Sequence, residues 1–176
     1  QFAYLDSSAI DSAYNNTRFL KVRLSDSSIV WVYEFASVLD AVPAVILSKV
    51  PHYLRPDLLT ITDQEYQAME IVAVVEEWDD WVKVINENKE ITGWVKKDVV
   101  GYDPIDLAFA LLASRALKHE EAEARIASLE ELLDNNPYPT TVFIPEMRKL
   151  LDEERASLRD SRDEEDRDRR DRRDRD

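Results

Sequence analysis

The sequence predicts an α+β protein with a mainly β N-terminal part and an α-helical C-terminal part. Two observations carry this prediction. Residues 19–33 and 81–95 share one pattern of aromatic, aliphatic, lysine and valine residues around a polar turn, which is typical of a β-hairpin. From Asp103 onward, apolar residues recur at helical spacing instead. The change from β to α therefore falls at this residue.

The hairpin pattern is an internal repeat. The two segments read FLKVRLSDSSIVWVY and WVKVINENKEITGWV. Lys21 matches Lys83, and Trp31 matches Trp94 with one residue of slippage in the turn. A unit that recurs after about sixty residues indicates two copies of one small domain. The first copy lacks its front half.

The first, partial unit is expected over residues 1–42. Residues 1–16 are mixed and rich in Ser, Asp and Asn. Alternation of apolar and basic side chains then predicts a strand, and a run of Asp and Ser predicts a turn. The expected elements are a strand at 19–24, a turn at 26–28, a strand at 30–33 and a short helical turn at 35–39.

The second, complete unit is expected over residues 43–102. A run of mostly β-branched residues at 71–75 is typical of a buried strand. Four acidic residues surround Trp78 and predict an exposed turn. The expected elements are a strand at 44–50 that ends at Pro51, a loop at 51–63, a strand at 71–75, an acidic turn at 76–80, a hairpin of 81–85 and 91–95, and a closing turn at 98–100.

The helical part is expected over residues 103–158. Asp103 is a typical N-cap, and Pro104 suits the first helical position. The apolar register slips at 118–122, which favours two helices joined by a short turn, with one bent helix as the alternative. The second helix stops at Asn135-Asn136-Pro137, and a third is expected from near Pro145.

The last eighteen residues, Arg159–Asp176, are nearly all Arg, Asp and Glu. They have no apolar side chain to bury, so we expect a disordered tail or a solvated helix. The tail holds eight Arg and nine acidic residues, which leaves −13 of the net charge of −14 on the rest of the chain. Because such a body repels phosphates, we expect no nucleic-acid partner. It also disfavours anionic wall polymers.

The second unit resembles a bacterial SH3 domain of the SH3b type over about residues 44–102. The family pattern has a tyrosine-containing loop, then val-val-glu, then gly-asp-trp-val-lys-val, then gly-trp-val. The matching residues are Val74, Val75, Glu76, Asp80, Trp81, Val82, Lys83, Val84, Gly93, Trp94, Val95 and Val99–Val100. Residues 17–40 match only the back half, with Val30 where the family has glycine. The segments LASRAL and IASLEELLDNNP are faintly similar to a tetratricopeptide helical hairpin.

The resemblance implies a small SH3-like barrel of five or six strands, in tandem with a partial copy. It also implies a non-catalytic binding or targeting module of the bacterial cell envelope, located outside the cytoplasm. The implied partner is a peptidoglycan peptide or a protein segment.

Aromatic residues are the candidates for ligand binding. Trp78, Trp81 and Trp94 could line a groove for a peptide or glycan, or they could pack within the barrel and the hairpin. Trp78 lies in the acidic turn, where it could contact a ligand or the helices. Tyr53 and Tyr66, in and after the long loop, are further groove candidates.

The sequence lacks the motifs of common catalytic sites, and its many carboxylates form no directed pair. His52 and His119 are the only histidines, and there is no cysteine, so zinc-thiolate sites and thiol nucleophiles are excluded. Gly93 and Gly101 are the only glycines, which leaves no nucleophile elbow and no phosphate-binding loop. We therefore expect no enzyme, no metal and no cofactor. No apolar stretch approaches the roughly eighteen residues of a membrane-spanning helix.

An alternative function belongs to another class. In it the protein is a structural or assembly protein, whose C-terminal helices and charged tail pair with another chain. This alternative predicts self-association through the helical part.

Overall fold

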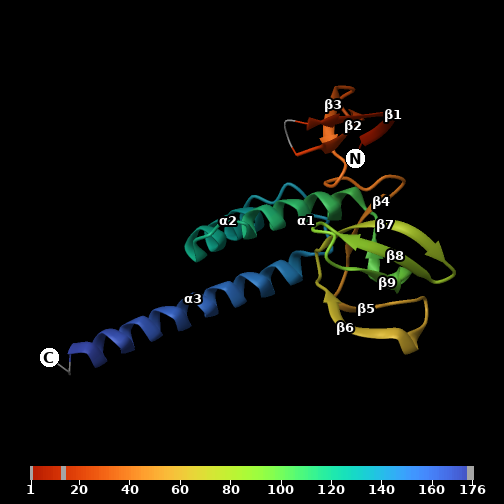
Figure 1. Ribbon diagram of the computed structural model, residues 1–176. Coiled ribbons are helices and arrows are strands. Elements are labelled where there is room, and N and C mark those ends of the chain that lie inside the picture. The colour runs from red at the N-terminus through yellow and green to blue at the C-terminus, as the bar shows by residue number, and fades with distance from the viewer. Residues whose placement is uncertain (1, 13–14, 174–176) are drawn as a thin grey trace.

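A computed structural model describes residues 2–12 and 15–173. Its described part holds ten strands in two antiparallel sheets, followed by three helices (Figure 1). The α+β class with a mainly β N-terminal part is thereby confirmed. The first sheet is joined to the second by the linker at 34–41, and the helices follow the second sheet along the chain.

The first sheet is a three-stranded meander in the order β1-β2-β3. Its strands are β1 (Phe2–Asp11), β2 (Thr17–Leu24) and β3 (Ile29–Tyr33). The turn between β2 and β3 is closed by Asp26, whose Oδ1 accepts hydrogen bonds from the backbone N (2.9 Å) and the hydroxyl (2.6 Å) of Ser28. The two predicted strands and the turn therefore form where expected.

Two features of this unit differ from the prediction. β1 forms within the segment that showed no strand pattern, because its backbone pairs along β2 with an irregularity between Tyr4 and Ser8. The expected helical turn at 35–39 is instead a pair of tight turns. The amides of Ala36 and Ser37 bond to the carbonyls of Tyr33 and Glu34, and no helix follows.

The second sheet has seven strands in the order β10-β4-β7-β8-β9-β5-β6. The 3₁₀ turn η2 (Leu58–Thr60) precedes β6, and η3 (Lys97–Val99) precedes β10. The strands are β4 (Val42–Ile46), β5 (Val50–Tyr53), β6 (Ile61–Tyr66), β7 (Ile71–Trp78), β8 (Trp81–Asn86), β9 (Thr92–Lys96) and β10 (Val100–Gly101).

The region around Pro51 is organised differently from the prediction. The expected strand at 44–50 is broken after Ile46, and Pro51 lies inside β5 instead of ending a strand. Proline lacks a backbone N–H, and the β5–β6 pairing is irregular between Pro51 and Tyr53. The expected loop at 51–63 is largely a hairpin, whose turn is closed by a hydrogen bond from Arg55 N to Thr60 Oγ1 at 3.1 Å.

The internal repeat is reproduced in the pairing of the strands. Lys21 lies opposite Trp31 across β2 and β3, and Lys83 lies opposite Trp94 across β8 and β9. The third strand matches too, since Tyr4 pairs with Val22 as Val74 pairs with Val84, and each ladder becomes irregular directly afterwards. The first sheet thus has the register of β7-β8-β9 without the other four strands.

The helices are α1 (Pro104–Leu117), α2 (Ala122–Asp134) and α3 (Ile144–Arg173). Asp103 caps α1 through its Oδ1, which accepts a hydrogen bond from Ile105 N at 2.8 Å. α1 and α2 are two separate helices, as predicted, and do not form the single bent helix that was the alternative. The second helix ends at Asn135, also as predicted. α3 continues through Arg173, so the described part of the charged tail is helical, and it extends away from both sheets (Figure 1).

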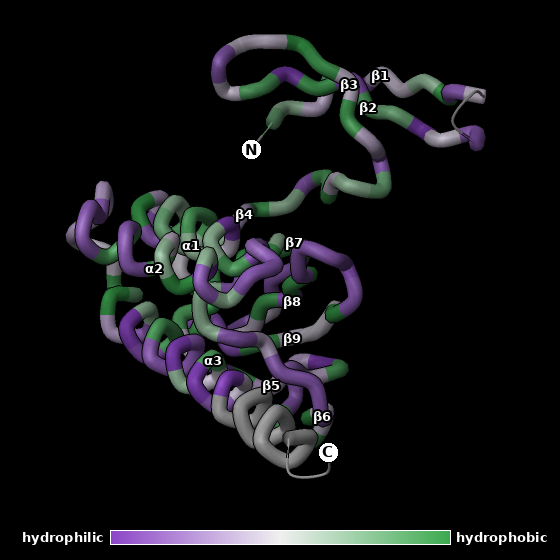
Figure 2. Tube along the Cα trace, turned by 90° about the vertical axis from the view of Figure 1, so that its left-hand side faces the viewer, coloured by the Kyte–Doolittle hydropathy of each residue, from purple (hydrophilic) through white to green (hydrophobic). Residues whose placement is uncertain are grey.

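Two apolar clusters hold these parts together. One lies within the second sheet and includes Ile46, Tyr66 and Val84. The other joins Val45 and Met69 to the helices. α1 is largely hydrophobic, whereas α3 is mostly hydrophilic (Figure 2) and contributes only apolar residues near its start, such as Met147 and Leu151. The residues of the helical part at its centre are Phe109, Ala110, Leu129, Met147 and Phe143, which directly precedes α3.

Asp106 is a buried polar group in this second cluster. Its side chain is 7% exposed, and its Oδ1 accepts hydrogen bonds from Thr141 Oγ1 (2.7 Å) and Val142 N (3.0 Å). The start of α1 is thereby tied to the segment that leads into α3. Asp106 lies in the first turn of α1, and no pattern in the sequence indicates its contact with Thr141 and Val142.

Candidate functional site

One face of the second sheet gathers four of the five candidate aromatic residues. Residues that pair directly across strands lie on the same face of a sheet. The register places Ile61, Tyr53, Trp94, Lys83 and Glu76 in one row across β6, β5, β9, β8 and β7. Trp78, Trp81 and Lys96 form the next row. We call the surface made by Tyr53, Trp78, Trp81, Trp94, Lys83 and Lys96 the aromatic face.

Trp78 is the exposed tryptophan of this face. It is 65% exposed and lies opposite Trp81, at the two ends of the turn Asp79-Asp80. Asp79 has a φ of 51°, a conformation that aspartate tolerates better than most residues. An indole held at the end of a strand, as Trp78 is at the end of β7, offers a flat apolar surface to a ligand at little conformational cost.

The acidic turn around Trp78 is shorter than predicted. Glu76 and Glu77 belong to β7, because the ladder with β8 continues to Trp78. Both carboxylates are in ion pairs, Glu76 with Lys83 at 3.6 Å and Glu77 with Lys97 at 3.0 Å. The acidic turn expected at 76–80 is therefore reduced to the two aspartates Asp79 and Asp80.

Trp81 and Trp94 are packed rather than open. Trp81 is 6% exposed, with the Tyr53 ring edge-on at 5.0 Å and Lys96 Nζ 4.1 Å from the ring centroid. Trp94 is 7% exposed and lies opposite Tyr53 across β9 and β5. Both tryptophans therefore support the sheet, while the half-buried Tyr53 and Lys96 form part of the surface beside Trp78.

Tyr66 lies on the opposite face of the sheet, in the core. It has no exposed surface, and its hydroxyl donates to the carbonyls of Val84 (3.1 Å) and Ile91 (3.4 Å). Burial raises the pKa of the Tyr66 phenol far above its ordinary value, so the hydroxyl remains protonated. Tyr66 therefore offers no surface to a ligand.

His52 also belongs to the interior. It is 3% exposed, its ring lies 5.9 Å from that of Tyr66, and its Nδ1 is 3.1 Å from Thr62 Oγ1. Burial lowers the pKa of His52, so the neutral imidazole is favoured. Among the side chains that the structure describes, no three His, Asp or Glu residues gather in a way that could hold a metal ion.

Sequence reasoning missed two exposed groups. Tyr102 follows β10 and is 42% exposed, and its pKa is raised by partial burial and by the Glu77 carboxylate. An aromatic residue directly after the closing turn was the available signal. The second group surrounds the β5–β6 turn, where a Leu-Leu pair in a polar loop was the signal. It consists of Leu54, Leu58, Leu59 and Ile61.

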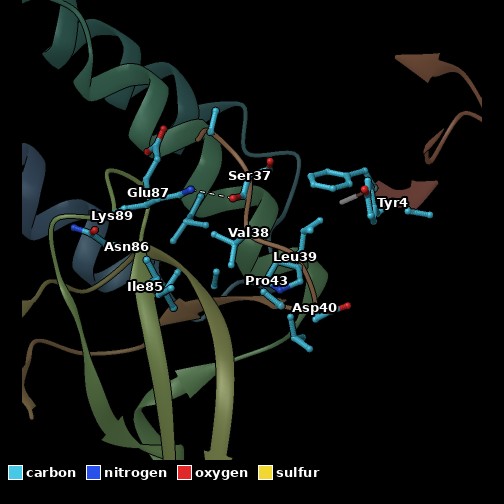
Figure 3. A pocket seen from close by; sticks show the side chains of 18 residues that line it. Tyr4, Ser37, Val38, Leu39, Asp40, Pro43, Ile85, Asn86, Glu87 and Lys89 are labelled. Atoms are coloured by element: carbon cyan, nitrogen blue, oxygen red, sulfur yellow. Dashed lines mark hydrogen bonds between the residues drawn. The ribbon is translucent and has the colours of Figure 1, made fainter. Parts of the chain in front are cut away.

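Two pockets lie away from the aromatic face. The first, of about 540 Å³, is bounded by β1, the linker at 36–43 and the far ends of β7 and β8. Figure 3 shows Lys89 reaching across it to donate a 2.9 Å hydrogen bond to the carbonyl of Ser37. The second, of about 720 Å³, lies between the second sheet and helices α1 and α3. Neither pocket is lined by a predicted site residue.

In comparisons with known families and with curated proteins, no family model and no curated protein matches this chain. Within the described residues, no helix combines the length and the apolar character that crossing a membrane requires.

Proposed function

We propose that this chain is a non-catalytic binding protein that recognises an extended peptide segment on the aromatic face. The observation that carries the proposal is the exposed Trp78 indole beside Tyr53, Trp81 and Lys96. A rigid aromatic surface without a deep cavity suits an extended chain better than a small molecule. The two aspartates of the neighbouring turn favour a peptide that carries an amino or guanidinium group.

The SH3-like character of residues 43–102 is part of this proposal. It is supported by the order of elements along the chain: a strand, a tyrosine-bearing hairpin, a strand ending in Trp78, the Lys83–Trp94 hairpin and a short closing turn. It implies a cell-wall peptide or an envelope protein segment as the ligand, and a location outside the cytoplasm.

Sedimentation with purified peptidoglycan tests the wall ligand. The wild-type chain is expected to be retained, and Trp78→Ala to be lost, because this substitution removes exposed surface without opening the core. Trp31→Ala, in the other unit, is the matched control and should be retained. If the wild-type chain is not retained, the wall ligand is wrong. An array of basic and neutral peptides, probed with the same variants, then tests the protein ligand.

A second candidate function, assembly through the C-terminal helices, is favoured by the extension of α3 away from the sheets (Figure 1), in a direction set by its ion pairs with α2. These are Arg125–Glu154 (2.9 Å), Arg155–Glu130 (2.6 Å) and Arg162–Glu123 (2.7 Å). They align α3 along α2 and direct its continuation away from the sheets (Figure 1). Light scattering with and without residues 163–176 tests this function. A smaller oligomer after truncation supports assembly, whereas a monomer in both cases contradicts it.

A further inference from the structure

The first sheet is a copy of β7-β8-β9 whose outer surface is uncovered. Trp31 occupies the place that Trp94 has in the second sheet, since each lies opposite the equivalent lysine. Trp31 is 47% exposed, however, whereas Trp94 is 7% exposed. The residues beside Trp31 on the same face of β3 are Ile29 and Tyr33, which are 53% and 46% exposed.

The reason for this difference is a missing neighbour strand. In the second sheet, β9 is followed by β5, which runs antiparallel to it and places Tyr53 opposite Trp94. In the first sheet, β3 is the outermost strand. In the complete unit, the equivalent surface is therefore covered by an added strand, β5, that carries an aromatic residue, Tyr53.

The open edge of β3 has hydrogen-bonding groups to receive such a strand. Glu34 N donates to Arg18 O, and Leu24 N donates to Ser28 O, which fixes the alternation of the β2–β3 ladder. In an antiparallel ladder every second residue points its N–H and C=O outward. On β3 these residues are Ile29, Trp31 and Tyr33, the same residues whose side chains are exposed. The carbonyl of Tyr33 already accepts hydrogen bonds from Ala36 N and Ser37 Oγ, so Tyr33 offers an added strand only its N–H.

The charge on this surface indicates which kind of segment would bind there as an added strand. Lys21 and Arg23 lie on the same face as Trp31, and neither forms an ion pair with any residue that the structure describes. In the second sheet the equivalent Lys83 is paired with Glu76. The segment at 50–66, which forms the β5–β6 hairpin, has three acidic residues and one arginine. An acidic segment is thus complementary to Lys21 and Arg23.

From these observations we infer that β3 is a second binding site, which takes an acidic, extended segment of another protein as an added antiparallel strand. The segment places an aromatic or branched apolar side chain opposite Trp31 and a carboxylate near Lys21 or Arg23. Binding by strand addition draws affinity from backbone hydrogen bonds and specificity from alternate side chains. This site is separate from the aromatic face and does not depend on it.

A synthetic peptide with the sequence of residues 50–66 is the probe, because it reproduces the segment that covers Trp94. Added to the full chain, it is expected to quench or shift tryptophan fluorescence in a saturable way. Hydrogen exchange should slow at the amides of Trp31 and Tyr33. Trp31→Ala and Lys21→Glu should each weaken binding at least tenfold, as should replacing the tyrosine at the fourth position of the peptide by alanine.

Val142→Ala, an exposed apolar position outside both proposed binding surfaces, is the matched control and should bind the peptide like the wild-type chain. Circular dichroism of Trp31→Ala verifies that the first sheet is still folded. Two results would overturn the inference. One is no saturable binding together with unchanged exchange at Trp31 and Tyr33. The other is a wild-type dimer that Trp31→Ala dissociates, because the strand would then come from a second copy of this chain.

Discussion

The ring of His52 packs directly on the backbone of Gly93. A Cβ built at Gly93 would lie 2.1 Å from His52 Cδ2, well inside the contact distance of two carbon atoms. His52 cannot move away easily, because it is 3% exposed and bonded to Thr62. The contact gives this glycine a packing role.

Gly93→Ala is therefore expected to destabilise the protein. Overpacking a filled core costs about 1–3 kcal/mol, and chemical denaturation would measure the loss. Gly101→Ala is the matched control, since its Cβ would meet the flexible end of Leu47 at 2.6 Å. We expect a clearly smaller loss for Gly101→Ala, and equal losses would contradict the role of His52.

The burial of His52 makes stability depend on pH. Its folded pKa lies below the ordinary value of 6.5, so the unfolded chain takes up a proton first as the pH falls. The contribution of neutral His52 is present above pH 6.5 and is lost as the pH falls below that value. Thermal melts between pH 7.5 and 5 should show a shallower pH dependence in His52→Gln than in wild type. An equally steep pH dependence in His52→Gln and wild type would contradict this role of His52.

Asp106 is expected to be a stability residue rather than a site residue. Asp106→Ala leaves Thr141 and the amide of Val142 without their buried acceptor, which costs about 1–3 kcal/mol. The N-cap variant Asp103→Ala should cost only about 1 kcal/mol, since its position is exposed. Urea denaturation of both variants tests this order, and a reversed order would contradict it.

Trp78 and Trp81 are expected to differ in how much their substitution lowers the free energy of unfolding. Trp78→Ala removes an exposed side chain and should change the free energy of unfolding by no more than about 0.5 kcal/mol. Trp81→Ala empties a packed position beside Tyr53 and should cost about 3–5 kcal/mol. Similar losses in the two variants would show that Trp78 is also structural, and it would then be unsuitable for binding tests.

Local patterns in the sequence predicted the elements that depend on local physics. The hairpin strands follow from side-chain alternation, and the start of α1 follows from Asp103 and Pro104, because a cap acts within one turn. β1 and β6 were missed, since their segments lack alternation and are held as strands by pairing with β2 and β5. Long-range pairing leaves no mark on the sequence of a single strand.

The sequence could predict which aromatic residues belong to the candidate site, but not which of their side chains are exposed. Four of the five aromatic residues share one face, which strand alternation could indicate. Whether each is open depends on what crosses it: β5 covers Trp94, and Tyr53 with Lys96 covers Trp81. Tyr66 lay in the same expected loop region as Tyr53, yet its strand turns it into the core.

The His52–Gly93 contact also determines which of the two similar hairpins fits between β7 and β5. The position equivalent to Gly93 in the first hairpin is Val30, since Val30 pairs with Val22 as Gly93 pairs with Val84. A β2–β3 hairpin placed beside β7 would drive the Val30 side chain into His52. The absence of a side chain at Gly93 thus favours β9 over β3 as the strand that lies beside β5.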